Sequence, residues 1–334
     1  MIHVVAYGSK SFKIPVGIYN HADHRFWFGV SVGDAVVEMR KWGAEYSQKY
    51  RGVACPQYEI AVPAERCDIR KKNKIACREK LGFPLDKKII LTVGRGSKYK
   101  PITGKNFVEL IRPLLSNNED VILVSIGHGY QGFDEWRNFE REFKGRFILY
   151  DAVPNENLFD FVFASDIQVN SYPIGGIVTM SDAVRCSVPI LSMTSDIDWM
   201  GKSLAYCKTD EEFINKAQKL LYDDSYRAYH LKNVSDALNK DAGYVSFKEK
   251  IMSFMDTLMT RQHAIHDFES RSAEYTDLEQ VFLKIGRKTF FRFRFLMRLL
   301  QVRIVLIRSV LITIFFACDS LLRFFRTGHF KYEK

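Results

Sequence analysis

The sequence lacks the cysteine spacing of a zinc site or a disulfide framework. Its six cysteines are scattered over 334 residues, and no two of them form a C-x-x-C pair. This distribution is typical of reduced thiols in a cytosolic protein. The N-terminus, MIHVVAYGSK, has neither a basic lead nor a long apolar run, so we expect no signal peptide. Internal repeats and low-complexity tracts are also absent, which argues against a solenoid or a fibrous protein.

The chain has few acidic residues for its number of basic ones. Lysine and arginine total 49 against 39 aspartates and glutamates, which gives a net charge of +10. Such an excess favours an anionic partner, and nucleic acid, an acidic membrane surface and a phosphorylated substrate all fit it. Hydrophobic residues make up 47% of the chain, which excludes wholesale disorder and allows two domains with sizeable cores.

The pattern over residues 87–207 predicts an α/β fold. Unbroken apolar runs alternate with amphipathic segments, and this is typical of a parallel sheet with helices on both faces. The expected strands are residues 87–94, 120–127, 146–153, 166–173 and 188–193. The expected helices between them are residues 103–116, 133–143, 155–165 and 181–187.

Changes of composition divide the chain into four regions. Residues 1–84 predict a short first domain, with strands near 2–7, 15–19 and 58–63, a strand or a helix start at 34–39, and a basic helix over 66–84. Residues 85–245 predict a nucleotide-binding domain, which ends in polar helices. Residues 246–282 are interpreted as a helical linker, and residues 283–327 as basic amphipathic helices.

The stretch SYPIGGIVTMSDAV, residues 171–184, is the first candidate for a binding site. Gly175 and Gly176 follow an expected strand, and glycine allows a ligand close to the backbone and tolerates positive φ. The N–H groups of a following helix suit phosphate, and Thr179 adds a hydroxyl. Asp182 would accept from the hydroxyls of a ribose. The alternative is a plain strand–loop–helix turn with a solvated aspartate.

The segment GGIVTMSDAVRCSVPIL resembles the nucleotide-sugar motif of GT-B glycosyltransferases. Asp182 falls on the motif's acidic position, Pro189 on its proline, and Gly175 or Gly176 on its glycine turn. Ile174 stands where the retaining group has glutamate, so the match to the O-GlcNAc-transferase-like group is better. The resemblance covers residues 87–240 and, loosely, 14–65. It implies two Rossmann-like domains, of which the N-terminal one is incomplete here.

A basic loop, VGRGSKYKPITGKNF, follows the first strand of this unit. Its cations would neutralise a diphosphate leaving group, and they are Arg95, Lys98, Lys100 and Lys105. The resemblance implies a basic residue here, with Tyr99-Lys100 similar to the Y-K of the O-GlcNAc-transferase-like group. Gly94-Arg95 and Lys105 are similar to the G-R…K-G pair of the retaining group. We therefore rank Lys100 first. A solvated basic loop is the alternative.

Two further loops follow strands at the same expected edge. The resemblance implies that the nucleobase is held by backbone groups of the loop after the third strand, at Ala152 and Val153. Gly127 and Gly129 follow the second strand in a similar position. These assignments rest on the order of the strands alone.

The loop after the expected strand 15–19 carries Asn20, His21, Asp23 and His24. Either histidine would take a proton from an acceptor hydroxyl, and Asp23 would orient it or serve as the base. The H-x-x-H spacing also suits a metal, but no third ligand is evident, and we expect no bound metal. A third interpretation is structural, with both histidines packed against neighbouring aromatic residues.

Residues 283–327 combine an apolar composition with regularly placed arginines. Arg287, Arg294 and Arg308 are spaced by multiples of seven and fall on one side of a helix. A narrow cationic stripe on a broad apolar helix is typical of a helix lying in a membrane interface. A spanning helix over 304–322 is the rival, but Arg308 and Asp319 within it would each cost roughly 2.5 kcal/mol. A helix buried against a partner subunit is also possible on this pattern.

These patterns predict a glycosyltransferase that uses a UDP- or GDP-linked sugar as substrate and binds no cofactor. The acceptor would be a lipid-linked or cell-surface glycan intermediate. We expect a cytoplasmic protein, peripheral on the inner face of the cell membrane through 283–327, with no nucleic-acid partner. A non-catalytic scaffold that recruits a transferase to the membrane is the main alternative. A nucleotide-sugar epimerase on the same fold is the third.

Overall fold

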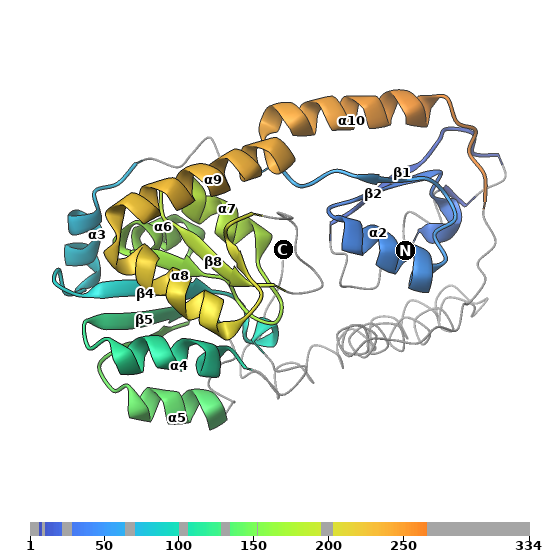
Figure 1. Cartoon of the computed structure of the whole chain (residues 1–334). Helices are drawn as coiled ribbons and strands as arrows, with labels where there is room; N and C mark the ends of the chain where they lie inside the picture. Colours follow the sequence, from blue (N-terminus) through green and yellow to red (C-terminus); the bar gives the residue numbers. More distant parts are fainter. Residues whose placement is uncertain are drawn as a thin grey trace, which may run out of the picture. The chain divides into compact units, whose positions relative to one another are not determined.

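A computed structural model describes residues 7–8, 11–21, 29–63, 71–99, 106–127, 134–151, 153–194 and 203–265. Within these residues the strands form two parallel sheets, one of three strands and one of six (Figure 1). Residues 2–6 of the predicted first strand and the amphipathic region 283–327 lie outside the described residues.

The small sheet has the order β1-β2-β3, with every neighbouring pair parallel. Its strands are β1 (Gly17–Asn20), β2 (Ala35–Glu38) and β3 (Gln57–Glu59), and α2 (Lys41–Arg51) lies between the last two in sequence. One face is apolar and packs against α10 (Tyr244–Met259), where Val37 and Ile60 meet Phe254. Part of the segment predicted as a linker is therefore a helix that covers this sheet.

The large sheet has the order β6-β5-β4-β7-β8-β9, and all its neighbouring strands are parallel. Its strands are β4 (Lys88–Val93), β5 (Val121–Ile126), β6 (Phe147–Tyr150), β7 (Ile167–Val169), β8 (Ile190–Met193) and β9 (Tyr206–Cys207). This is the order of a doubly wound nucleotide-binding sheet, so the predicted α/β class is confirmed. The two-residue strand β9 is not predicted by the sequence pattern, because two residues carry no periodicity.

Alternate residues of each strand enter different cores, which is why the strands are apolar throughout. Ile90 and Leu123 belong to the core on one face, whereas Ile89 and Ile122 belong to the core on the other. The first face is covered by α4 (Phe107–Asn117), α5 (Asp134–Glu142) and α8 (Asp210–Tyr222). The second is covered by α3 (Lys74–Leu81), α6 (Asn155–Ala164), α7 (Ile177–Arg185) and α9 (Asp224–Ala242).

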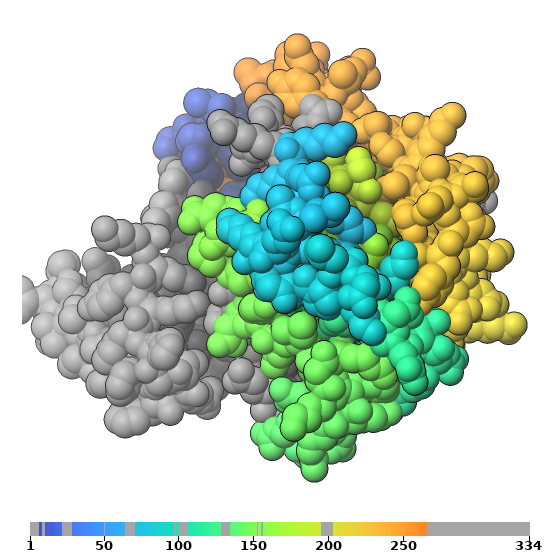
Figure 2. All heavy atoms as spheres, turned by 90° about the vertical axis from the view of Figure 1, so that its left-hand side faces the viewer, coloured from blue at the N-terminus to red at the C-terminus, as the bar shows by residue number. Residues whose placement is uncertain are grey.

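Helix α3 is shorter than predicted within the described residues, and it packs on α6 beside the large sheet. The Asn73 side chain caps its start by accepting from the N–H of Ala76, and it ends at Gly82, where φ is +69°. Figure 2 shows the cyan atoms of this region at the centre of one face, between green and yellow segments of the large-sheet unit. The predicted basic helix is thus part of the second core, through Cys77.

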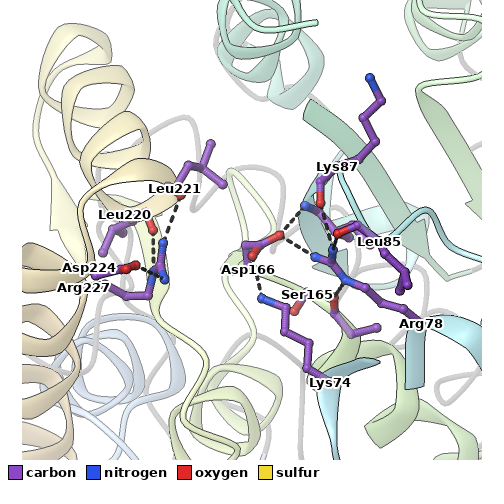
Figure 3. Close-up of polar contacts among 12 residues, drawn as sticks. Lys74, Arg78, Leu85, Lys87, Ser165, Asp166, Leu220, Leu221, Asp224 and Arg227 are labelled. Atoms are coloured by element: carbon purple, nitrogen blue, oxygen red, sulfur yellow. Dashed lines mark hydrogen bonds and ion pairs between the residues drawn. The ribbon is translucent and has the colours of Figure 1, made fainter. Parts of the chain in front are cut away.

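A buried ion-pair cluster fastens α3 to the sheet (Figure 3). Arg78 and Lys74 point from α3 to Asp166, which directly precedes β7, at 2.7 Å and 2.5 Å. Asp166 also accepts from the backbone N–H of Ile89 at 2.6 Å. The same Arg78 guanidinium donates to the carbonyl groups of Leu85 and Lys87 and so holds the loop that enters β4.

Candidate functional site

The order of the large sheet defines where a ligand would bind. Strand β4 has β5 on one side and β7 on the other, so the chain reverses its direction of winding between β4 and β7. In such sheets ligands bind in the crevice beyond the carboxyl ends of the strands at this point. Gly94 follows β4 and Asn170 follows β7, and a Cβ added at Gly94 would lie 3.2 Å from the Cβ of Ser171. The basic loop and the glycine turn therefore meet at the crevice.

The turn between β7 and α7 is held by its own side chains. The Asn170 Oδ1 atom accepts from the N–H of Gly176 at 2.8 Å, and the Ser171 hydroxyl donates to the carbonyl of Ile174 at 2.7 Å. Gly176 is the N-cap of α7, which begins at Ile177 rather than at Ser181 as the sequence predicted. Gly176 has no side chain that could accept from the N–H groups after it, and among the described residues Asn170 accepts only from the N–H of Gly176 itself. A helix that follows a parallel strand begins at the carboxyl edge of the sheet, so the next N–H groups of α7 lie at the crevice, where an anion is stabilised.

Close packing requires glycine at both positions of the turn. A Cβ at Gly175 would lie 2.6 Å from the Asn170 Nδ2 atom. A Cβ at Gly176 would lie 2.8 Å from the Thr179 Oγ1 atom and 3.1 Å from the Lys98 Nζ atom. Gly176 has a φ of −111°, so the expectation that glycine serves here for a positive φ is wrong for this residue. The polar groups around the turn leave no room for a side chain.

Lys98 brings a cation to this turn. Its Nζ donates to the carbonyl of Gly175 at 3.4 Å, and its own carbonyl accepts from the N–H of Ile174 at 3.2 Å. The pKa of Lys98 is lowered to about 8, mainly by burial and then by the positive charges of Arg40 and Arg95. A lysine whose pKa is lowered in this way is typical of functional sites. An anion bound in the crevice would relieve the repulsion between these charges.

The loop that carries Lys98 is anchored by the next residue. Tyr99 is fully buried, and its hydroxyl lies 2.8 Å from the Thr92 hydroxyl on β4. Its ring meets Phe107 and Trp136 edge to face, with centroids 5.1 and 5.4 Å apart. A rigid anchor beside Lys98 fixes where the ammonium group lies, which is what a preorganised anion site requires.

The other predicted residues take the following places. Asp182 lies in the second turn of α7 and is 4% exposed, and the Thr179 hydroxyl donates to the carbonyl of Gly176 at 3.3 Å. Val153 follows β6 and packs partly against the second core, while Arg95 is exposed in the basic loop. His21 is exposed directly after β1. Their roles stay predictions, and Lys100, Lys105, Asp23 and His24 lie outside the described residues.

Two residues matter more in the structure than the sequence indicated. Lys98 is one of four cations in the basic loop, and the sequence resemblance ranks Lys100 above it. Asn170 reads as the end of an apolar strand, but its side chain is 6% exposed and organises the turn, with Nδ2 donating to the Ser192 hydroxyl at 3.3 Å. The signal that points to it is an asparagine where a buried strand meets a glycine turn.

A hollow of about 260 Å³ lies at the opposite edge of the sheet, where β4 and β7 begin. It is lined by Lys74, Ile75, Arg78, Leu85, Asp86, Lys87, Lys88 and Asp166. The charges of Lys74 and Arg78 are already paired with Asp166. This hollow is therefore part of the cluster that fastens α3. In the described part of the chain, no three side chains of the metal-binding types gather, and no helix has the length and apolarity to cross a membrane.

No protein-family model and no curated protein matches the sequence. Solved structures do match the fold. Anabaena HepE, in complex with UDP and glucose, gives a TM-score of 0.56 at 12% identity, over 73% of this chain and 72% of that chain. A glycosyltransferase from Rickettsia africae gives a TM-score of 0.52 at 10% identity, over 67% of this chain and 63% of that chain. Sucrose-phosphate synthase from Thermosynechococcus elongatus gives a TM-score of 0.50 at 16% identity, over 69% of this chain and 60% of that chain.

These similarities define the class of fold. The chain has the GT-B fold of glycosyltransferases, which confirms the resemblance carried by the glycine turn and its aspartate. It spans 60% of the length of the sucrose-phosphate synthase and 63% of the Rickettsia protein. At 10 to 16% identity the likeness establishes the fold and leaves the reaction to be argued from the site.

Proposed function

We propose that this chain transfers a sugar from a nucleoside-diphosphate sugar to an acceptor. One observation carries the proposal: the Lys98 ammonium group lies beside the start of α7, whose N-cap residue Gly176 has no capping side chain, at the reversal point of the sheet. Two sources of positive potential converge there, and a diphosphate carries the matching charge. The similar fold of HepE, which is in complex with UDP and glucose, supports this choice of ligand.

The chemistry follows from the charge that develops during transfer. The bond between the anomeric carbon and the diphosphate oxygen breaks, and a bond from the acceptor oxygen to that carbon forms. Lys98 and the first-turn N–H groups of α7 would stabilise the departing diphosphate. Arg95, Lys100 and Lys105 would add positive charge from the same loop. Asp182 would hold the ribose and backbone groups at Val153 the nucleobase, with no bound metal or cofactor taking part.

The acceptor side belongs to the small sheet in this proposal. His21, exposed at the carboxyl end of β1, would take the proton of the acceptor hydroxyl, with His24 or Asp23 as the other candidates. The basic and apolar pattern of 283–327 supports an anionic membrane surface as the place of work. A lipid-linked glycan intermediate at the inner face of the cell membrane fits that location.

A non-catalytic scaffold is the second candidate, and one observation favours it. The small sheet has three strands among the described residues, against six in the large sheet. An acceptor domain of this size offers few groups for catalysis. The scaffold would keep the nucleotide site and lose turnover.

Thermal shift against UDP, GDP and CMP, each alone and as a sugar conjugate, tests the site. We expect stabilisation by one diphosphate, and its loss in Asp182→Asn and Lys98→Met. Val178→Ala is the matched control, because this side chain is 45% exposed on the first turn of α7 and the change keeps the backbone N–H. Donor turnover then separates the candidates: binding with turnover supports the transferase, binding without it supports the scaffold, and no binding refutes both.

A further inference from the structure

Helix α10 has one covered apolar face and one uncovered one. Phe247, Ile251, Phe254 and Leu258 pack on the small sheet. Beside this face the helix exposes Val245 (69%), Met252 (54%), Met255 (46%) and Met259 (66%). Isolated exposed apolar residues are normal, but four on one helix face are not. Methionine is also favoured at binding surfaces because its side chain adapts to different partners.

The spacing of the uncovered residues is that of a coiled-coil seam. Val245, Met252 and Met259 are seven apart, and Met255 lies three residues after Met252. Lys248 takes the one remaining seam position, three residues after Val245. Positions that alternate by three and four form a stripe that packs against another helix. A single lysine within such a stripe is a feature that specifies register at some loss of stability.

The charges on and beside the seam are complementary to themselves. Lys248 lies on the seam four residues before Met252, Asp256 lies beside it four residues after Met252, and neither makes an ion pair within the described residues. In an antiparallel pair of α10 helices with the two-fold axis at Met252, Lys248 of each copy lies level with Asp256 of the partner subunit, within reach of its flexible side chain. The same arrangement places Val245 opposite Met259 of the partner subunit. Isologous contacts of this kind generate closed dimers.

The charge of α10 argues against a bilayer as the occupant. The helix carries two basic residues, Lys248 and Lys250, and two acidic ones, Glu249 and Asp256, so its formal charge is zero. A surface that binds anionic lipid needs a positive excess, since each lysine or arginine contributes about 1 kcal/mol and each acidic residue opposes it. The self-complementary order of the same charges favours a helix of the same sequence.

From this seam we infer that α10 is a docking surface for a second copy of this chain, paired antiparallel about Met252. The contact is limited in size, because a helix of 16 residues is about 24 Å long. A single helix pair falls below the roughly 1,200 Å² of a standard interface, so the dimer is a weak, reversible one. The inference does not depend on the proposed sugar transfer.

Sedimentation equilibrium of the full chain over micromolar concentrations tests this pairing. We expect reversible dimerisation, which Met252→Glu abolishes and Lys248→Asp weakens at least about tenfold. The double exchange Lys248→Asp with Asp256→Lys restores it, because the pair is re-formed with its signs reversed. Lys250→Asp is the control, since residue 250 lies off the seam on the same helix. Unchanged melting temperatures establish that the variants are folded.

Three outcomes would overturn the inference. A monomer at every concentration shows that the seam does not pair. Dimerisation that survives Met252→Glu, or that the double exchange fails to restore, assigns the contact to another surface. Loss of binding to vesicles with anionic lipid in Met252→Glu, with the association in solution unaltered, makes the bilayer the occupant of this face.

Discussion

The ammonium group of Lys98 lies 3.4 Å from the carbonyl oxygen of Gly175, one residue before the N-cap of α7. The two elements approach each other although both are positive, since the start of a helix carries about half a positive charge. A buried cation beside a helix N-terminus is unfavourable until an anion binds between them. Such an arrangement suits the proposed diphosphate, and it lowers the stability of the protein without a ligand.

Replacing Lys98 by methionine should strengthen the fold and remove the ligand. The pKa of Lys98 is lowered to about 8, so the charged form is less stable in the folded protein than in the unfolded chain. At neutral pH we expect Lys98→Met to raise the melting temperature and to eliminate the shift by a nucleoside diphosphate. Lys144→Met, at an exposed site, is the control. A lower melting temperature with unchanged binding would assign Lys98 a structural role.

Diphosphate binding should weaken as the pH rises past about 8. Below the folded pKa of about 8 Lys98 is charged and attracts the anion, and above it the charge is lost. A phosphate has its second pKa near 6 and does not change charge over this range. Calorimetric titration with UDP or GDP at about pH 7 and pH 9 measures the effect. In Lys98→Met the affinity should be low and independent of pH, and an equal decline in both proteins would refute the assignment.

Gly176→Ala should weaken nucleotide binding while the chain stays folded. The added Cβ would lie 2.8 Å from the Thr179 Oγ1 atom and 3.1 Å from the Lys98 Nζ atom, so both groups must move out of the crevice. We expect a loss of affinity of at least about tenfold, or roughly 1.4 kcal/mol. Val178→Ala is expected to bind as the unaltered protein does. Full affinity in Gly176→Ala would mean that the ligand does not contact this turn.

The ion-pair cluster around Asp166, at the opposite edge of the large sheet, should affect the stability of the fold and not nucleotide binding. Arg78→Met leaves Asp166 with one partner fewer in a buried site and releases the carbonyl groups of Leu85 and Lys87. Breaking such a pair costs about 3–5 kcal/mol, which denaturant unfolding would measure. Lys80→Met, which removes an exposed partner of Asp160, should cost far less, because exposed ion pairs contribute little to stability. A changed nucleotide affinity in folded Arg78→Met would contradict the separation of the two edges.

The pKa of Asp34 predicts how the stability of the fold changes at low pH. Burial raises the pKa of Asp34, but donors from Val16, His263 and Ala264 lower it by more, so the net pKa is below its ordinary value. A depressed carboxyl pKa stabilises the fold above the unfolded value, near 3.8, and this contribution is lost as the pH falls through the folded value. Asp34→Asn should therefore lower stability at about pH 6 more than at about pH 3. Equal losses at both values would refute this linkage.

His263 takes part in the same contact. Its Nδ1 atom lies 2.8 Å from the Asp34 carboxylate and its Nε2 atom 2.9 Å from the carbonyl of Tyr7. The imidazole ring therefore links Asp34 to the backbone at Tyr7. His263→Gln keeps one donor and should lose part of the stabilisation that Asp34→Asn removes. The two changes should therefore combine less than additively in unfolding experiments.

The sequence alone determined the architecture around the site. Apolar runs such as KIILTV and VILVSI can be buried on both sides only within a covered parallel sheet, so the α/β class and the edge that carries the loops follow from pattern. The glycine pair before Asp182 gave the correct turn, although α7 begins at Ile177, four residues earlier than predicted. Where a helix begins depends on which backbone N–H groups find an acceptor. Here the Asn170 side chain accepts from the N–H of Gly176, six residues later in the sequence.

Only the tertiary structure showed that Lys98 contacts the glycine turn and where α10 packs. The sequence resemblance ranks Lys100 first in the basic loop, whereas the contact of Lys98 depends on Tyr99, whose burial between β4, α4 and α5 fixes this part of the loop. Likewise, α10 has two apolar faces in its sequence. Packing on the small sheet covers the one with Phe254 and Leu258 and leaves the methionine seam exposed. Contacts between residues distant in sequence determine these arrangements. A local sequence pattern sets whether a residue prefers to be buried, but it does not set which residue it packs against.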